Sequence, residues 1–484
     1  MKASGTLTLR LVYVAAMFLV AMDATIVNVA LLSIGSELHV PSAQTGSINI
    51  GYLTAVALSL PVAGWLGDRF GAKRVLLSAI TLFTAASVCC GLAASLEQLT
   101  LFRIIQGVGG GLVAPVGMAM LFRAFPPQER AKVSRSLILP IAAAPAVGPV
   151  IGGLLVEELS WRWCFYLNLP VGMAAVLIGW LLLQAEQQPP AGRLHLPGLL
   201  LSGPGFAMVI YALTEGAFQG WTSPSIVLTG LGGLAMLAAL VVTQLRASQP
   251  LLQLRLLGDR LFRTAALIGF CLSAGLLGML YVFPLMYQDV YGASALASGL
   301  TTFPEALGLM AASQLMPRSN RRLGPRKLMV SSLLGAVILF SLMCLVRSDT
   351  SPWLIRALMF GGGFTLGHAV GAVQLLAFAR MPAASMGQAS TLYQVQNRLG
   401  SALGVALLGS IMTYAGAADS AAPSASTGFA YQAALLGAAG FLLLAWCLAL
   451  TIRREDEEAV RPASKPANPP VQAAHAKQTI KQTI

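Results

Sequence analysis

Long apolar runs dominate the pattern of hydrophobic and polar positions along this chain, and short polar segments separate them. A helix needs about 20 apolar residues to cross the hydrocarbon core of a bilayer. The runs are too long for strands, and they lack the alternation of period two that is typical of outer-membrane barrels. The pattern therefore predicts an all-α integral membrane protein. The fourteen predicted helices cover residues 11–31, 48–66, 75–95, 99–121, 136–156, 163–183, 197–215, 225–245, 264–287, 297–316, 328–346, 353–376, 390–413 and 430–451.

The composition agrees with this interpretation. Of the 484 residues, 56% are hydrophobic and only 10% are charged, while a soluble domain carries about 25% charged residues. So few charges exclude a soluble enzyme, a disordered chain and a nucleic-acid-binding module.

Topology explains the net charge of +13. With the N-terminus placed in the cytoplasm, 26 of the 31 lysines and arginines fall on the cytoplasmic side. Membrane proteins carry such an excess in their cytoplasmic loops. We therefore expect a multi-pass protein with both termini in the cytoplasm and with no nucleic-acid partner.

Two distant segments match at one fixed offset. Residues 69–74 (RFGAKR) align with residues 322–327 (RLGPRK), and the same shift of 253 places Arg103 on Arg356. Internal repeats of this kind are typical of secondary transporters, whose substrate site lies between the repeats. The predicted parts are an N-terminal six-helix bundle (1–184), a two-helix insertion with flanking cytoplasmic loops (185–263), a C-terminal six-helix bundle (264–452) and a disordered cytoplasmic tail (453–484).

Five segments carry recognisable signatures, in the order expected for one family. They are residues 23–31 (DATIVNVAL), 64–74 (GWLGDRFGAKR), 101–107 (LFRIIQG), 148–153 (GPVIGG) and 161–172, which begins with Trp161-Arg162-Trp163. With these signatures the chain resembles the major facilitator superfamily and, within it, the fourteen-helix drug:proton antiporters of the EmrB/QacA type. The resemblance implies a proton-coupled antiporter of the bacterial cytoplasmic (inner) membrane, which exports amphipathic drugs or toxic compounds by alternating access.

The loop at residues 64–74 acts as a conformational latch between the two bundles in the family that the chain resembles. Its glycines allow two helices to end and restart within a tight turn. The alternative interpretation is a solvated, positively charged turn. The second repeat has Arg321 in place of Asp68, which argues against a symmetric latch. The predicted latch residues are Gly64, Gly67, Asp68, Arg69, Gly71, Lys73 and Arg74.

The fifth predicted helix contains the order Gly-Pro-x-x-Gly-Gly. Small residues allow the backbones of two membrane helices to approach closely. This order is similar to the signature that marks antiporters, so it favours export over uptake. The residues of this antiporter motif are Gly148, Pro149, Gly152 and Gly153.

Asp23 and Arg103 are charged residues inside predicted membrane helices. A charge at this depth is costly, so an ionisable residue there is a functional hypothesis by default. We predict that Asp23 takes up and releases protons and that Arg103 is its partner. The resemblance implies the same proton pathway for Arg103. The alternatives are a polar residue that fixes helix packing and an arginine that binds backbone carbonyls.

Glu305 is the second acid within a predicted span, where the family usually has an apolar residue. It is predicted to neutralise a cationic substrate or to act as a second proton site, unless it lies near the outer end and contacts water. His368 titrates near neutral pH in its free form, although a core histidine with satisfied hydrogen bonds is the preferred interpretation. The polar residues predicted to bind substrate are Asn28, Gln106, Glu305 and His368.

No cofactor or metal is predicted, because the six cysteines lack the spacing of metal ligands. The expected partners are small amphipathic substrates, often cationic, together with protons and the lipid bilayer. Some relatives dock a periplasmic adaptor, but the sequence shows no such contact. Two other functions stay open: a proton-coupled transporter of one specific metabolite (uptake or export), and a membrane enzyme or receptor. The sequence has no nucleophile–base pattern or phosphate loop that supports an enzyme.

Overall fold

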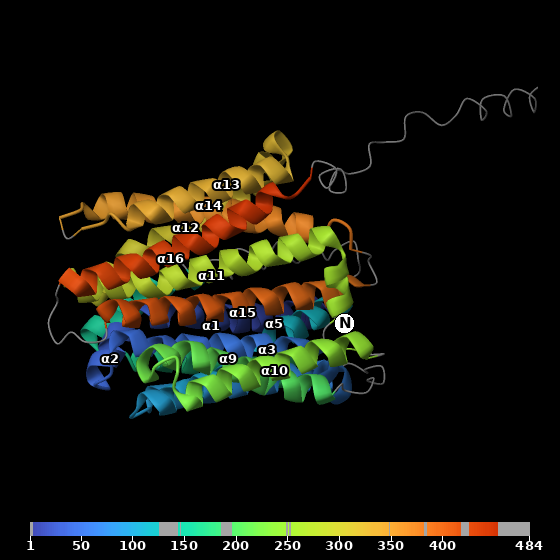
Figure 1. Ribbon diagram of the computed structural model, residues 1–484. Helices are drawn as coiled ribbons and strands as arrows, with labels where there is room; N and C mark the ends of the chain where they lie inside the picture. Colours follow the sequence, from blue (N-terminus) through green and yellow to red (C-terminus); the bar gives the residue numbers. More distant parts are fainter. Residues whose placement is uncertain are drawn as a thin grey trace, which may run out of the picture.

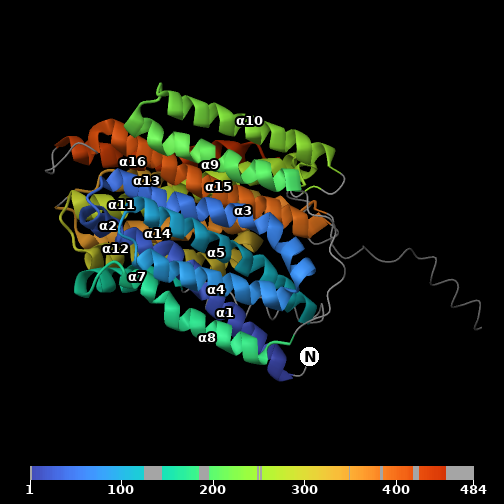
Figure 2. The ribbon, with the colours of Figure 1, turned by 90° about the horizontal axis from the view of Figure 1, so that it is seen from below.

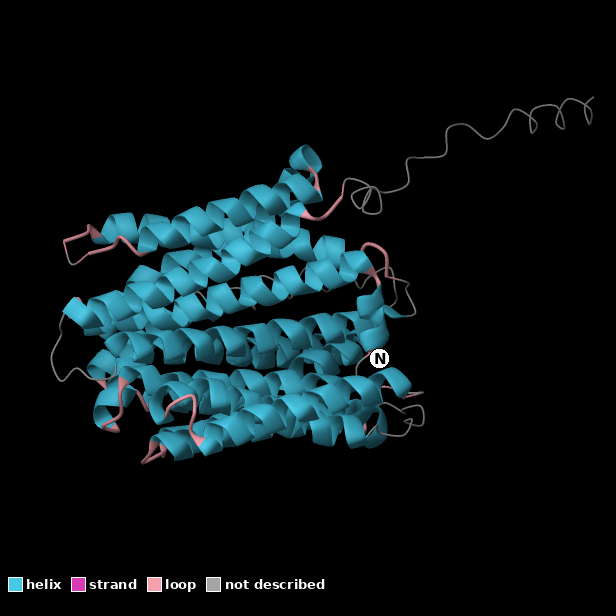
Figure 3. Ribbon diagram, viewed as in Figure 1, coloured by secondary structure: helices cyan, strands magenta, loops and turns pink. Residues whose placement is uncertain are grey.

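The computed structural model describes residues 3–124, 144–145, 147–184, 196–247, 250, 253–347, 349–381, 385–417 and 425–453. All regular structure in these ranges is helical, and they contain no strand (Figure 3). The long helices lie side by side and run roughly along one common direction (Figure 1). The prediction of an all-α membrane protein is confirmed.

Long helices lie at the positions of the predicted spans. The first part of the chain contains α1 (Ala3–Ile26), α2 (Leu31–Glu37), α3 (Gly46–Phe70), α4 (Ala72–Gly91), α5 (Leu96–Ala124), α7 (Trp163–Tyr166) and α8 (Asn168–Leu182). A further helix covers residues 147–158. The remainder contains α9 (Leu196–Gln219), α10 (Pro224–Arg246), α11 (Arg260–Asp289), α12 (Ala295–Leu323), α13 (Pro325–Met343), α14 (Pro352–Phe378), α15 (Met386–Met412) and α16 (Ala425–Leu450).

The number of membrane crossings stays a prediction. Within the described residues, ten helices are long and apolar enough to cross a bilayer by length and composition. In α9 the corresponding apolar stretch is shorter and covers Pro197–Leu213. Part of the fifth predicted helix, and nearly all of the predicted tail from residue 454, lie outside the described residues.

The two repeats fold into the same local turn. Gly71 directly follows α3 and Gly324 directly follows α12. The two glycines lie 253 residues apart, and both have positive φ (90° and 78°). Side chains rarely adopt this conformation, so glycine allows the next helix to begin at once. α5 then packs on both α3 and α4, as α14 packs on both α12 and α13.

A cation after each turn binds the end of a later helix. Lys73 Nζ donates to the carbonyl oxygen of Leu183, just after α8. In the second repeat, Arg326 Nε donates to the carbonyl oxygen of Ile452, just after α16, at 2.6 Å. The C-terminus of a helix is partly negative and therefore attracts cations. These contacts agree with the repeat, and the division into domains at residues 184, 263 and 452 stays a prediction.

The two ends of the bundle differ. We call the end that carries the chain's N-terminus and the two glycine turns the basic end, because Arg69, Arg74 and Arg322 lie there and are exposed. The opposite end, here the far end, contains α2 and α7 (Figure 2).

α9 and α10 lie together at one edge of the molecule (Figures 1 and 2). α9 packs against α10, α3 and α15. Ser410 Oγ on α15 donates to the carbonyl oxygen of Leu213 at 2.5 Å, which joins α9 to α15. The predicted insertion therefore contacts helices from both repeats.

Gly109→Val tests the close packing of α5 on α4. A Cβ atom at Gly109 would lie 2.8 Å from the carbonyl oxygen of Ala79 and 2.8 Å from the amide nitrogen of Phe83. Overfilling such a contact lowers the free energy of unfolding by about 1–3 kcal/mol. We expect a lower thermal unfolding midpoint in detergent. Gly440→Val is the control, because no atom lies within 4 Å of its Cβ position, and equal midpoints for both variants would contradict the packing argument.

Candidate functional site

The first helix is interrupted just beyond Asp23. α1 ends at Ile26, a single 3-10 turn covers Val27–Val29, and α2 begins at Leu31. Irregular backbone at membrane depth is tolerated only where protein surrounds it or where it lines a cavity. The three residues of the turn are buried.

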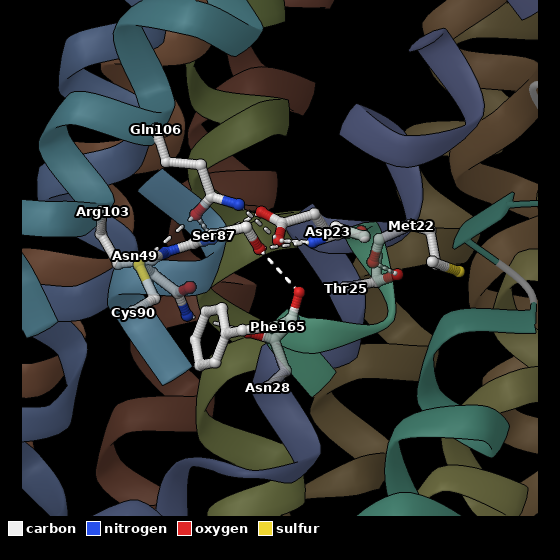
Figure 4. A network of polar contacts seen from close by, with 11 residues as sticks. Met22, Asp23, Thr25, Asn28, Asn49, Ser87, Cys90, Arg103, Gln106 and Phe165 are labelled. Atoms are coloured by element: carbon white, nitrogen blue, oxygen red, sulfur yellow. Dashed lines mark hydrogen bonds and ion pairs between the residues drawn. The ribbon is translucent and has the colours of Figure 1, made fainter. Parts of the chain in front are cut away.

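Asp23 is fully buried and accepts three hydrogen bonds (Figure 4). Arg103 Nη1 donates to Asp23 Oδ2 at 2.5 Å. Gln106 Nε2 and Asn168 Nδ2 each donate to Asp23 Oδ1 at 2.9 Å. Arg103 Nη1 also donates to Gln106 Oε1 at 2.8 Å. The predicted partnership of Asp23 and Arg103 is therefore present in the structure, and α1, α5 and α8 meet at the carboxylate.

Further contacts surround the ion pair. Asn168 Nδ2 also donates to Ser87 Oγ at 2.9 Å, and Ser87 Oγ donates to the carbonyl oxygen of Phe165 at 2.9 Å. The Arg103 guanidinium lies 4.1 Å from the centre of the Tyr52 ring. A cation over an aromatic face is stabilised electrostatically, most strongly where water is excluded.

Glu305 lines a separate small cavity. The cavity has a volume of about 40 Å³ and lies where α1 and the turn after it meet α11 and α12. The Glu305 side chain is 2% exposed, and neither carboxylate oxygen has a hydrogen-bond partner among the described residues. A buried carboxylate without a donor is costly, so this position requires a proton, a cation or water as its partner. The cavity is lined by Thr25, Asn28, Val29, Pro145, Pro149, Leu280, Pro284, Thr302, Glu305, Ala306 and Leu309.

Asn28 lies in the 3-10 turn and contacts this cavity. Asn49 Nδ2 on α3 donates to Asn28 Oδ1 at 2.8 Å. Thr25 also lines the cavity, and its hydroxyl donates to the carbonyl oxygen of Met22 at 3.1 Å. The same interrupted helix therefore carries Asp23 and two residues that border Glu305.

The structure separates the other predicted substrate residues from this cavity. Gln106 is fully buried in the Asp23 network. His368 is 3% exposed, and both its ring nitrogens have partners: Phe364 O at 3.0 Å from Nδ1 and Ser319 Oγ at 3.0 Å from Nε2. The carbonyl can only accept, so Nδ1 carries a proton and donates to it. This geometry agrees with a core histidine.

The antiporter motif lies between α1 and α12. A Cβ atom at Gly148 would meet Thr25 Oγ1, and one at Gly152 would lie 2.8 Å from the carbonyl oxygen of Ile26. A Cβ atom at Gly153 would lie 2.6 Å from Leu296 Cα on α12. Only glycine permits such close approaches, so the motif brings helices from the two repeats together.

Within the predicted latch, Lys73 binds the end of α8. Besides its bond to Leu183, Lys73 Nζ donates to the carbonyl oxygen of Trp180 at 3.0 Å. Arg69 and Arg74 are exposed. No described atom lies within 4 Å of a Cβ position at Gly64 or Gly67. The side chain of Asp68 is not among those that the structure describes. The latch between the bundles stays a prediction.

Sequence reasoning missed several polar partners of the two acids. Asn49, Tyr52 and Ser87 are single neutral residues in apolar helices, and nothing in one sequence separates them from ordinary packing residues. Asn168 belongs to the fifth signature, which marked the segment without revealing its contact with Asp23.

Comparison with known proteins identifies the class. The family model described as Major Facilitator Superfamily matches residues 13–405. The chain therefore belongs to the major facilitator superfamily, a family of membrane transporters. This membership confirms the resemblance seen in the sequence and agrees with a multi-pass membrane protein.

Particular relatives are drug transporters by name. The chain is 30% identical over 400 residues to the multidrug transporter protein MdtP of Bacillus subtilis. The match covers 82% of this chain and 73% of the relative. It is 29% identical over 415 residues to the multidrug resistance protein B homolog of Mycobacterium tuberculosis (85% and 77%). It is 28% identical over 412 residues to the multidrug export protein EmrB of Haemophilus influenzae (84% and 80%).

Solved structures share the fold at low identity. A bacterial homologue of the human lysosomal transporter Spinster, in an inward-facing and unoccupied conformation, superposes with a TM-score of 0.67 at 16% identity, covering 96% of this chain and all of that one. The D-xylose–proton symporter gives a TM-score of 0.64 at 16% identity, covering 92% and 98%.

Arg103→Met tests the ion pair. It leaves the Asp23 carboxylate buried without its cation, which lowers the free energy of unfolding by about 3–5 kcal/mol. Adding Asp23→Asn removes the unpaired charge, so we expect the double variant to regain part of the loss in denaturant or thermal unfolding. The exposed Arg347 serves as a control, and Arg347→Met changes stability by only about 0.5 kcal/mol. A double variant less stable than Arg103→Met would refute the argument.

Proposed function

We propose that this protein is a proton-coupled antiporter that exports amphipathic drugs or toxic compounds by alternating access. The printed names of its relatives support drug export. The observation that carries the proposal is that one interrupted helix carries both Asp23, which pairs with Arg103, and residues that line the Glu305 cavity.

The proposal includes an orientation. The exposed cations of the basic end favour the cytoplasmic side, by the positive-inside rule. Both termini then lie in the cytoplasm, and the far end faces outward. The family and its bacterial relatives support the bacterial cytoplasmic membrane as the location.

Contacts across the far end support a state that is closed to the outside. Gln288 Nε2 on α11 donates to the carbonyl oxygen of Val29 at 3.3 Å. Glu157 Oε2 accepts from the amide nitrogen of Leu296 at 3.3 Å, at the N-terminus of α12. A carboxylate is favourable at this partly positive helix end. Opening outward requires both contacts to break, as well as the close approach of Gly153 to α12.

A proton at Asp23 would act on this arrangement through α1. Protonation removes the negative charge that faces Arg103, and the ion pair loses its Coulombic attraction. The register of α1 against α5 and α8 is then less constrained. Since the 3-10 turn lies between Asp23 and Asn28, a shift of α1 would be transmitted to the Glu305 cavity. Proton binding and substrate release would be coupled in this way.

Glu305 would pair with the positive charge of a cationic substrate or with a second proton. The cavity of about 40 Å³ is far smaller than the roughly 300–1,000 Å³ of drug-sized sites. A substrate therefore requires α11 and α12 to separate from α1, which is the movement expected for alternating access.

Asp23→Asn tests proton coupling. The amide keeps the size of the side chain, but it does not take up a proton at physiological pH and forms no ion pair with Arg103. In sealed vesicles of known orientation, we expect substrate-induced proton release and proton-driven ethidium export to be lost. Glu158→Gln is the matched control, because it removes an exposed carboxylate. Unchanged proton release in Asp23→Asn would refute the assignment, and proton-linked flux in the inward direction would identify an importer.

Glu305→Gln tests the recognition of charge. Losing one charged hydrogen bond of about 1.5–3 kcal/mol weakens binding by roughly 10–150-fold. We expect the apparent KM to rise by at least about tenfold for a cationic dye and by less than about twofold for a neutral amphipathic drug. Equal losses for both substrates would contradict charge pairing.

A further inference from the structure

A large groove lies between the inserted pair and the first repeat, apart from the candidate site. Its volume is about 780 Å³, and it runs along α3, α5 and α9. It shares no lining residue with the Glu305 cavity. We call it the lateral groove. It is lined by Ser47, Ile50, Gly51, Thr54, Ala55, Leu58, Ser59, Val62, Leu66, Thr100, Ile104, Val108, Leu112, Leu199, Gly203, Ala207, Met208, Ile210, Tyr211, Glu215 and Thr229.

The groove opens sideways, toward the hydrocarbon of the bilayer. Ile104 and Val108 line it from α5 and are 40% and 37% exposed. α3 and α5 both meet the length and hydropathy of membrane-crossing helices, so the groove lies at membrane depth. Side chains such as Ile104 and Val108 offer water no hydrogen bonds, so this opening favours an apolar ligand.

Polar groups lie at a few defined positions along these walls. Thr54 is 7% exposed, and its hydroxyl oxygen has no hydrogen-bond partner in the part of the chain that the structure describes. Glu215 is the single charged residue among the lining residues. It lies about one turn from the end of α9 and just beyond the apolar stretch Pro197–Leu213, so we expect it near the membrane surface on the far side. No cation lines the described groove, so its walls offer no ion-pair partner for a phosphate. Glu215 is a partner for an ammonium group.

We propose that the lateral groove binds a phosphatidylethanolamine molecule of the bilayer, with one acyl chain along α3 and α5 and its ammonium group beside Glu215. The acyl chain fills the apolar walls, and the headgroup ammonium matches the carboxylate at the far end. The glycerophosphate backbone stays at the membrane surface.

This lipid would separate α9 from α5 while α9 stays bonded to α15 through Ser410 and Leu213. The inserted pair would then be attached by protein contacts to the second repeat and to α3, while its contact with α5 would be largely an acyl chain. Such a contact lets α5 move relative to α9 without breaking side-chain packing between them. The proposal does not depend on which substrate is transported.

Gly203→Trp is the test variant, because Gly203 lines the groove and no atom lies within 4 Å of its Cβ position. The open Cβ position lets the indole extend into the groove. Gly440→Trp is the matched control: it also meets open space, and Gly440 lies on α16 outside the groove. Ala207→Phe is a second groove-filling variant from another turn of α9.

The experiment uses the full chain in vesicles that contain phosphatidylethanolamine with a photoreactive diazirine in one acyl chain. After illumination, mass spectrometry locates the labelled peptides. We expect labels on α3 or α5 and on α9 in the unmodified protein and in Gly440→Trp. In Gly203→Trp and Ala207→Phe these labels fall about tenfold, because displacing even two methylene groups weakens binding by that factor. Equal thermal unfolding midpoints of the variants show that folding is preserved.

Glu215→Gln separates the headgroup from the chain. The comparison lipid is a phosphatidylglycerol that carries the same diazirine chain. We expect the unmodified protein to be labelled more strongly by phosphatidylethanolamine, and Glu215→Gln to be labelled equally by the two lipids. Equal labelling of Gly203→Trp and Gly440→Trp would overturn the lipid site. Displacement of the label by ethidium would also overturn it, because the groove would then bind substrate.

Discussion

A single charge in hydrocarbon costs several kcal/mol, and the pairing of Asp23 with Arg103 is the constraint on which the first repeat depends. The two side chains come from α1 and α5 and are fully buried. Arg103 has one short bond to the carboxylate, and two neutral amides supply the remaining donors to it. The registers of α1, α5 and α8 are fixed together because all three must satisfy the same carboxylate. A change of charge at this one group therefore reaches three helices at once.

The sequence predicted the ion pair because each charge stands alone in a long apolar run, where the bilayer makes it conspicuous. The same logic identified Glu305, and the structure places this acid in a buried cavity between helices of the two repeats. Neutral partners such as Ser87 and Asn49 could not be predicted, since an isolated hydroxyl or amide costs little in any helix that has a neighbour to bind it. Three-dimensional proximity alone reveals them.

The helical architecture followed from hydropathy, since backbone groups at membrane depth must be satisfied within each helix. The interruption of the first helix after Ile26 was not predicted, because Val27 and Val29 continue the apolar run and one asparagine between them does not mark a helix end. That break depends on tertiary contacts such as the bond from Asn49 to Asn28. His368 shows the reverse case: its residue type suggested chemistry, and its two hydrogen bonds agree with the core interpretation instead. The number of crossings depends on helices of intermediate hydropathy and stays a prediction.

The bonds of Lys73 and Arg326 have a consequence for how such a chain can grow. Each cation follows the second long helix of its repeat and binds the end of the last one, so the early and late parts of each repeat are fastened together. A repeat fastened in this way does not depend on the connecting segment that follows it for its stability. Extra polypeptide between two such units is then neutral for folding, as insertions at exposed junctions generally are. The α9–α10 pair occupies that junction, and evolution could add it to a duplicated ancestor without rebuilding either copy.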